Sequence, residues 1–310
     1  MTPSSDALSG PDDALEPDGF TVTADDGARI HFLDWGGPAA GAGPVTTVVT
    51  LHGLAQTAWI WAPVGRRVGG PSGRIHLATP DLRGHGLSDA PTEDGAYDLE
   101  ILAADAIAVA EGAASGPLGD ARLILAGHGF GAIVAAGAAA RLGDGCAGLV
   151  LIDGGWESME NATGLDVEEF LRGLEEPPEV MRSLDAFLAD RRAFDPGTWD
   201  DDQERAARAT IVETHAGRVV PATRPHALDA CVRTMFAYDP LATLATVGAP
   251  VVALIAADDE TGSRSRAVEA ASAARIAAGH PPIRLVSLRP VGHNLMRYRP
   301  TEVAAAILSI

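Results

Sequence analysis

The chain has 310 residues, of which 46% are hydrophobic and 21% are charged, so it can bury a large core, and a disordered or collagen-like chain is excluded. Its formal net charge of -19 opposes binding to nucleic acids and to anionic membrane surfaces. All 23 basic residues are arginines. Without a lysine amine, Schiff-base catalysis is excluded.

The N-terminal segment and the two cysteines indicate the cellular compartment. Residues 1–18 are acidic and contain neither a basic start nor an apolar run, which predicts a flexible tail rather than a signal peptide or membrane anchor. Cys146 and Cys231 are too few for a disulfide scaffold and have no histidine at metal-ligand spacing. We therefore expect a cytoplasmic protein with no metal and no other cofactor.

Short strand-like runs alternate with alanine-rich segments of helical periodicity, as is typical of a parallel sheet covered by helices on both faces. The runs predicted as eight strands of one sheet are residues 21–23, 29–35, 46–51, 76–80, 123–125, 149–152, 251–255 and 284–287. The segments predicted as helices are residues 99–113, 130–141, 265–278 and 301–308.

One long interval, residues 154–240, lacks strand-like runs and has a helical pattern interrupted by prolines. Residues 153–204 hold 16 acidic residues against four arginines, so much of the negative charge is concentrated there. We predict that residues 154–240 form a helical cap, and that residues 19–153 and 241–310 form the core on which it rests.

Four motifs follow the predicted strands in chain order. They are His52-Gly53-Leu54, the run Pro80-Asp81-Leu82-Arg83-Gly84-His85-Gly86-Leu87-Ser88, the run Gly127-His128-Gly129-Phe130-Gly131 and Gly292-His293-Asn294. Together they resemble the α/β-hydrolase superfamily, in particular its lidded type, which includes epoxide hydrolases and haloperoxidase-like esterases. The resemblance runs from about Gly19 to Ile310. It implies an α/β fold with an eight-stranded, mostly parallel sheet flanked by helices, and a helical lid insertion.

The resemblance also implies roles for single residues. His293 would be the catalytic base, and the backbone N–H groups of Leu54 and Phe130 would form an oxyanion hole. The acid that orients His293 is expected at Asp259, which follows a strand at the family's spacing, with Asp153 at the end of another strand as the alternative.

The chain departs from the family at the nucleophile. In the G-x-S-x-G elbow the middle residue carries the reactive atom above the sheet, and here that residue is Gly129. The flanking glycines still permit a sharp turn and close helix packing. Covalent acyl-enzyme chemistry is therefore not supported, and neither is the aspartate nucleophile of epoxide hydrolases.

Three hypotheses remain for the function. In the first, which we favour, Gly129 is natural and His293 with Asp259 acts as a general base, either activating water directly or abstracting a substrate proton in a lyase, cyclase or oxygenase type of step. In the second, the chain is a serine esterase or lactonase in which glycine has replaced the natural serine. In the third, it is a non-catalytic protein that binds a ligand.

A small apolar molecule is the partner that we expect, with no nucleic acid or membrane partner, and a homodimer is left open. The predicted pocket residues are His52, Gly53, His128, Trp156, Met159 and Phe236. We interpret His52, His85 and His128 as structural residues that bond to backbone atoms. Asp81 and Arg83 are expected to form a buried salt bridge or to brace a turn.

Overall fold

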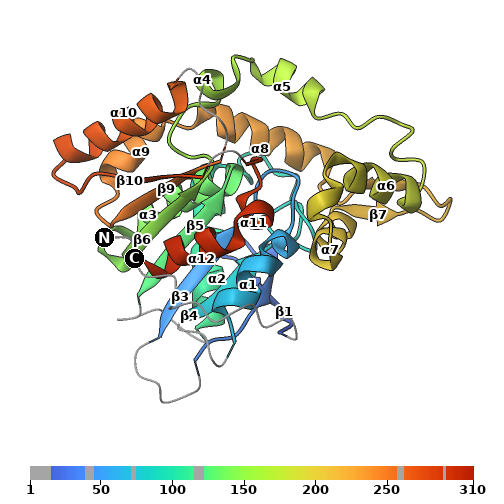
Figure 1. The fold of residues 1–310 in the computed structure, drawn as a ribbon, viewed down its shortest axis with the longest axis horizontal. Coiled ribbons are helices and arrows are strands. Elements are labelled where there is room, and N and C mark those ends of the chain that lie inside the picture. The colour runs from blue at the N-terminus through green and yellow to red at the C-terminus, as the bar shows by residue number, and fades with distance from the viewer. Residues whose placement is uncertain (1–14, 39–44, 71–74, 115–121, 257–261, 289–290) are drawn as a thin grey trace.

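The fold is built on one eight-stranded sheet with the strand order β1-β2-β4-β3-β5-β6-β9-β10 (Figure 1). It comes from a computed structural model that describes residues 15–38, 45–70, 75–114, 122–256, 262–288 and 291–310. The six strands β4, β3, β5, β6, β9 and β10 run parallel to one another. In contrast, β1 pairs antiparallel with β2, and β2 pairs antiparallel with β4. The strands are β1 (Asp18–Thr23), β2 (Arg29–Asp34), β3 (Thr46–Leu51), β4 (Ile75–Pro80), β5 (Leu123–His128), β6 (Cys146–Ile152), β9 (Val251–Ile255) and β10 (Arg284–Ser287).

Helices cover both faces of the sheet, because the central strands carry apolar side chains on both sides. In β5, Leu123 and Leu125 pack into one apolar cluster, and Ile124 and Ala126 pack into the other. The first cluster lies under α2 (Leu99–Ala113), α3 (Phe130–Leu142), α9 (Pro240–Thr246) and α10 (Ser263–Ala277). The second lies under α1 (Ala62–Val68), α11 (Leu295–Tyr298) and α12 (Pro300–Leu308).

The eight predicted strands and the predicted α/β-hydrolase type of fold are confirmed. Three strands are three residues longer than predicted: β1 begins at Asp18, β5 ends at His128, and β6 begins at Cys146 rather than at residue 149. Cys146 and Gly148 pair with β5 in the parallel ladder. Weak intrinsic strand preference in this stretch is thus overridden by pairing with a neighbouring strand.

Residues 154–240, which we call the inserted segment, leave the sheet after β6 and come back shortly before β9. Figure 1 shows its helices α4, α5 and α8 across one end of the sheet, and α6, α7 and β7 to one side. A short antiparallel hairpin interrupts the predicted helical pattern, because β-branched residues flank a turn at Gly217, whose φ is +72°. Its elements are α4 (Met159–Thr163), α5 (Val167–Gly173), α6 (Leu184–Phe194), α7 (Asp201–Ala209), β7 (Ile211–Glu213), β8 (Val219–Pro221) and α8 (Pro225–Ala237).

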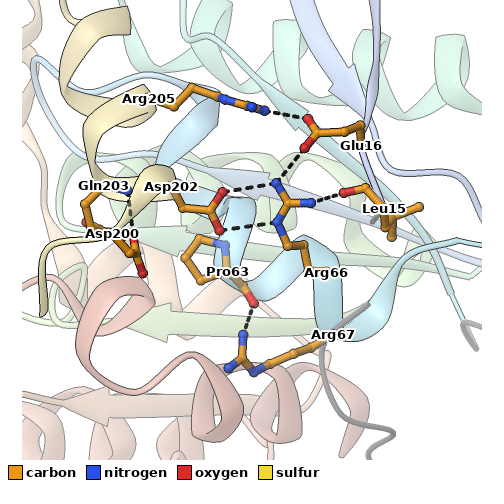
Figure 2. Close-up of polar contacts among 9 residues, drawn as sticks. All are labelled: Leu15, Glu16, Pro63, Arg66, Arg67, Asp200, Asp202, Gln203 and Arg205. Atoms are coloured by element: carbon orange, nitrogen blue, oxygen red, sulfur yellow. Dashed lines mark hydrogen bonds and ion pairs between the residues drawn. The ribbon is translucent and has the colours of Figure 1, made fainter. Parts of the chain in front are cut away.

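An arginine of the core holds helix α7 in place (Figure 2). The buried guanidinium of Arg66, on α1, bonds through Nε and Nη2 to the carboxylate of Asp202 at 3.3 and 3.1 Å. The same group bonds to Glu16 at 2.8 Å and to the carbonyl oxygen of Leu15. The last residues of the segment that was predicted as a flexible tail therefore make contacts, and β1 begins at Asp18.

Asp81 and Arg83 are both buried, and of the two expected arrangements they do not form a salt bridge with each other. Arg83 makes a two-pronged bond with Asp105, at 2.8 Å for each contact, and also bonds Asp26. Asp81 accepts hydrogen bonds from the backbone of Ala58 and Leu87 and from the ring of His31. The bond from Leu87 braces the turn after β4, which was the other expected arrangement.

Within the described residues, no helix is both long and apolar enough to cross a membrane.

Candidate active site

The turn between β5 and α3 has the geometry of a nucleophile elbow. Gly129 lies there with φ +52° and ψ -114°, a backbone conformation that residues other than glycine adopt only under strain. Its neighbours must be small, because a Cβ on Gly127 would lie 2.1 Å from the oxygen of Gly131, and one on Gly131 would lie 2.3 Å from the oxygen of Leu51. The flanking glycines thus allow helix α3 to lie against the sheet, as the sequence predicts.

Gly129 itself has room for a side chain. An ideal Cβ at this position would lie 3.4 Å from Nε2 of His293, which is an ordinary van der Waals contact. The imidazole of His293 therefore faces the place where the family carries its reactive atom. The space beside Nε2 is open to a water molecule or to a substrate atom.

The other ring nitrogen of His293 is held by Asp153. Nδ1 donates a hydrogen bond to Oδ2 of Asp153, because an ionised carboxylate can only accept. In the neutral ring this leaves Nε2 without a proton and able to receive one. The side chain of His293 is 62% exposed, whereas that of Asp153 is 1% exposed.

Asp153 is fixed at the end of β6 by several contacts. Its φ of +49° is unusual for a residue other than glycine. Oδ1 accepts hydrogen bonds from the backbone of Ala256 at 2.9 Å and from Arg264 at 2.8 Å. Burial alone would raise the pKa of Asp153, but the bond from His293 and the charge of Arg264 bring this pKa below its ordinary value. Asp153 is therefore a carboxylate at neutral pH.

Two backbone amides, those of Leu54 and Phe130, belong to residues beside the same cavity. Among the backbone hydrogen bonds of turns and loops in the described part of the chain, none has the N–H of Leu54 as its donor. Phe130 is the first residue of α3, and the first N–H groups of a helix have no partner within it. Both residues line the cavity that contains Gly129 and His293.

This cavity has a volume of about 430 Å³, which is in the range of small-molecule sites. The inserted segment closes one side of it with Met159, Phe170, Leu174 and Met235. Most of its polar lining is gathered at the sheet end, namely Gln56, His128, Asp153, Glu157, Arg264 and His293, and Thr163 on α4 is a further polar residue. A largely apolar wall thus faces a compact group of polar side chains.

The structure brings together His293, Asp153, Gly129, Leu54 and Phe130 around the cavity. Asp259, the acid that the sequence favoured, lies outside the described residues. Of the predicted pocket residues, Gly53, His128 and Met159 line the cavity. The described lining does not include the other three, His52, Trp156 and Phe236.

Packing explains these three positions. His52 is fully buried, and its ring accepts a hydrogen bond from the backbone of Leu82. Trp156 is buried beside Arg264, whose guanidinium lies 5.3 Å from the ring centroid. Phe236 packs against Phe170, which itself lines the cavity. These side chains support the wall rather than form it.

The three glycine-flanked histidines bond to backbone atoms, as expected. His52 and His85 donate to the carbonyl oxygens of Gly53 and Arg83. Nε2 of His128 donates to the carbonyl oxygen of His293, at 3.1 Å. Desolvation, with the charge of His293 as a further cause, lowers the pKa of His128 to about 3. His128 is therefore neutral, and it supports the loop that carries His293.

Sequence reasoning missed Arg264, Glu157 and Gln56 as lining residues. Arg264 follows a loop after β9, and nothing in the local sequence shows that its side chain reaches the end of β6. Arg264 comes just before the helix predicted for residues 265–278, so the helical periodicity gave it no role. Among the described residues, no group of three or more histidine, cysteine, aspartate and glutamate side chains could hold a metal ion.

The family can now be assigned. Residues 48–306 match the model of the alpha/beta hydrolase family, which is most of the chain. The chain belongs to the alpha/beta hydrolase family. This assignment agrees with the sheet order and with the elbow between β5 and α3.

Curated relatives match only one part of this family member. Epoxide hydrolase A of Mycobacterium tuberculosis is 32% identical over 111 residues, which are 35% of this chain and 30% of that protein. Epoxide hydrolase 4 of Mus musculus is 30% identical over 111 residues, which are 36% of this chain and 27% of that protein. The match thus spans less than a third of the length of either relative.

Solved structures resemble the whole chain. E-2-(acetamidomethylene)succinate hydrolase has a TM-score of 0.72 at 21% identity, covering 94% of this chain and 98% of that one. The thioesterase domain from the curacin biosynthetic pathway has a TM-score of 0.68 at 20% identity, covering 94% and 99%. An alpha/beta hydrolase from Novosphingobium aromaticivorans has a TM-score of 0.65 at 20% identity, covering 95% and 99%. At these identities the likeness concerns the fold.

Proposed function

We propose that this alpha/beta hydrolase family member uses His293 as a general base on a small, largely apolar substrate, without a covalent nucleophile. One observation carries the proposal: Nε2 of His293 faces the unoccupied side-chain position of Gly129, at 3.4 Å from an ideal Cβ, while Nδ1 is held by Asp153. A base that is oriented by a carboxylate and faces open space can take a proton from water or from the substrate.

In the hydrolytic form of the mechanism, a water molecule lies beside Nε2 of His293 and attacks the electrophilic carbon of the substrate. The water proton passes to Nε2, and the new C–O bond leaves negative charge on the former carbonyl oxygen. The amides of Leu54 and Phe130 bind this oxygen. The tetrahedral intermediate then collapses, and the protonated imidazole returns the proton to the leaving group.

The same atoms support proton abstraction from a substrate C–H or O–H group, as in lyase or cyclase steps. Asp153 stabilises the imidazolium in either case, because its carboxylate is buried beside the ring. We assign the orienting role to Asp153 within this proposal. The epoxide hydrolase names among the relatives make epoxides one substrate class to test, together with esters and lactones.

The test is the substitution His293→Gln, which keeps polarity at the site and removes the base. We expect turnover of the best substrate in a panel of apolar esters, lactones and epoxides to fall about 10²- to 10⁴-fold. Steady-state assays measure this, and incorporation of ¹⁸O from labelled water into the product shows whether the reaction is a hydrolysis rather than a lyase or cyclase step. Exposed His215→Gln is the matched control, and turnover that survives His293→Gln would contradict the proposal.

A second candidate is a serine hydrolase in which glycine has replaced the natural serine. The observation that favours it is the preserved elbow, where the φ of Gly129 is +52° and a Cβ fits against His293. Reading codon 129 in the source gene decides between the two candidates. A serine codon there supports the second, and a glycine codon supports the first.

A further inference from the structure

Arg264 joins the polar end of the cavity from an element that carries none of the proposed catalytic groups. It is the second residue of α10, and its side chain reaches the end of β6. Nη1 lies 2.8 Å from Oδ1 of Asp153, and Nε lies 3.2 Å from Oε1 of Glu157. The guanidinium also lies over the ring of Trp156, at 5.3 Å from the centroid.

These contacts divide the two oxygens of Asp153 between two tasks. Oδ1 is occupied by Arg264 and by the backbone N–H of Ala256, at 2.8 and 2.9 Å. Oδ2 is left to His293. Because a carboxylate can rotate about its Cβ–Cγ bond, the bonds to Oδ1 fix which oxygen faces the imidazole and in which plane.

Arg264 also changes the charge that His293 experiences. In the described part of the chain, the charged or titratable groups around the imidazole are Asp153 and Glu157 after β6, Arg264 on α10 and His128 at the end of β5. His128 is neutral, as argued above. The carboxylate of Asp153 stabilises the imidazolium, and the positive charge of Arg264 opposes that effect.

An anion-binding role for Arg264 is less well supported. The guanidinium lies between two carboxylates, those of Asp153 and Glu157, so this group of three charges is negative overall. A substrate carboxylate would have to compete with both partners. The side chain of Arg264 is 21% exposed, and those of Asp153 and Glu157 are 1% and 9% exposed, so the three charges interact away from bulk water.

We propose that Arg264 is a positioning residue that presents Oδ2 of Asp153 to His293 and limits how strongly that carboxylate favours the protonated imidazole. The effect of Arg264 on turnover rests on the general-base function proposed above. Its effect on the Asp153–His293 pair does not depend on that function. The consequence is that Arg264 keeps the base unprotonated to a lower pH than Asp153 alone would allow.

The test is an NMR titration of the His293 ring in the full chain, with the resonance assigned by its loss in His293→Gln. Arg264→Met removes the charge and keeps most of the stem, so the His293 titration midpoint should rise by about one pH unit. Glu157→Gln removes a negative charge beside Arg264, so the positive charge of Arg264 is offset less and the midpoint should fall by about half a unit. Arg264→Lys retains the charge and should stay near the parent midpoint.

Shifts of opposite sign in Arg264→Met and Glu157→Gln are the signature of this role, because loss of structure would move both variants in the same direction. No shift in Arg264→Met, or a fall, would overturn the inference. If Arg264→Met does not fold, the Glu157→Gln titration still decides by its sign.

Turnover is measured separately. The acidic limb of the pH–rate profile should follow the NMR midpoint in each variant. Arg264→Lys should lower kcat about tenfold more than it raises KM, because an ammonium group lacks the planar fork with which the guanidinium bonds Asp153 and Glu157 at once. If the NMR shifts appear while the parent protein turns over nothing in the substrate panel, the inference stands and the general-base function fails.

Discussion

The backbone at Gly129 is that of a reactive residue, although the residue has no reactive atom. Its φ of +52° and ψ of -114° are maintained by close packing at Gly127 and Gly131 rather than by any side chain at the turn itself. Replacing the residue at 129 should therefore leave the turn in place. This makes Gly129 a position where chemistry can be exchanged without rebuilding the site.

We expect Gly129→Ser to give a protein that acylates. The new hydroxyl would lie within reach of Nε2 of His293, since the Cβ lies 3.4 Å from that nitrogen, and the imidazole would activate it. The strained φ should cost about 1 to 2 kcal/mol of stability. A burst of nitrophenol from an activated ester and one acyl adduct in the intact mass measure the acylation.

Gly129→Ala is the matched control, because it carries the same backbone cost and no nucleophile. A folded Gly129→Ser protein with neither burst nor adduct would show that His293 or the two amides are not aligned with the elbow.

At the same scale, the sequence pointed to His293 and Gly129 because both lie within short local motifs, and both line one cavity in the structure. The acid is harder to identify from the sequence. The local pattern favoured Asp259, which lies outside the described residues, with Asp153 as the alternative. The structure places Asp153 against the imidazole, with a positive φ and a bond to Ala256, about 100 residues away in sequence. Neither the φ angle nor this long-range bond has a signature in the residues around Asp153.

Among the elements, helix α7 depends on polar contacts for its place beside α1. Its apolar contribution to the core clusters is small, with Ala206 in one of them. In contrast, Asp202 bonds Arg66, and the guanidinium of Arg205 bonds Glu16 (Figure 2). The guanidinium of Arg205 also lies over the ring of Trp59, at 4.7 Å from the centroid. The attachment of this part of the inserted segment is therefore sensitive to charge.

Arg66→Met should loosen α7. The substitution removes the bonds to Asp202 and Glu16, and we expect the free energy of unfolding to fall by about 2 kcal/mol, the usual cost of losing hydrogen bonds to charged groups. Amide hydrogen exchange should speed up in α7 before it does so in the sheet.

Arg208→Met is the control on the same helix. Its exposed pair with Glu204 spans one turn, and such pairs contribute about 0.3 to 0.5 kcal/mol. Equal losses in the two variants would mean that the Arg66 cluster is no more important than a surface ion pair.

The elements differ in how well the sequence predicts them. Helix α2 was predicted with its observed bounds, Leu99–Ala113, because its apolar residues repeat with helical periodicity. The β7–β8 hairpin was missed, since each of its strands has three residues and the two strands together contribute a single buried side chain, Val219. Strands this short are stabilised by their pairing and not by a pattern that can be read in advance.

For the molecule as a whole, three histidines are buried without charge near the sheet end. His52, His85 and His128 are each at most 1% exposed. Desolvation, together with neighbouring charges, lowers the pKa of both His85 and His128 to about 3, and desolvation lowers that of His52. The unfolded chain binds protons at these positions below the ordinary value of 6.5, whereas the native chain does not.

Stability should consequently be lost as the pH falls from about 6.5 towards 3. His85 and His128 each contribute a slope of about 1.4 kcal/mol per pH unit within this window. We expect His85→Asn to reduce the slope of unfolding free energy against pH by about that amount between pH 6 and 4. Urea denaturation at several pH values measures the slope.

Exposed His215→Asn should leave the slope as it is. The comparison between variants removes the common effect of the -19 net charge, whose repulsion also changes over this range. A slope that is the same in His85→Asn and the parent would mean that His85 takes up a proton in the native state.

The overall architecture was predictable because its signals are repeated along the chain. Eight strand-like runs and the order of four motifs each restrict the fold, and the alternation of side chains such as Leu123 and Ile124 between two clusters follows from strand geometry. The wall of the cavity was less predictable. Met159 lines it and Trp156 does not, although both lie just after β6, because the path of a loop decides which side chain turns inward.

The open position at Gly129 also bears on how such a protein can change over evolutionary time. Some glycine codons become serine codons through a single base change. Such a mutant would already have the turn, the flanking glycines and the facing imidazole, without any second substitution. Genetic drift could thus carry the same scaffold from one catalytic strategy to another in one step, and a library randomised at codon 129 alone would sample that transition.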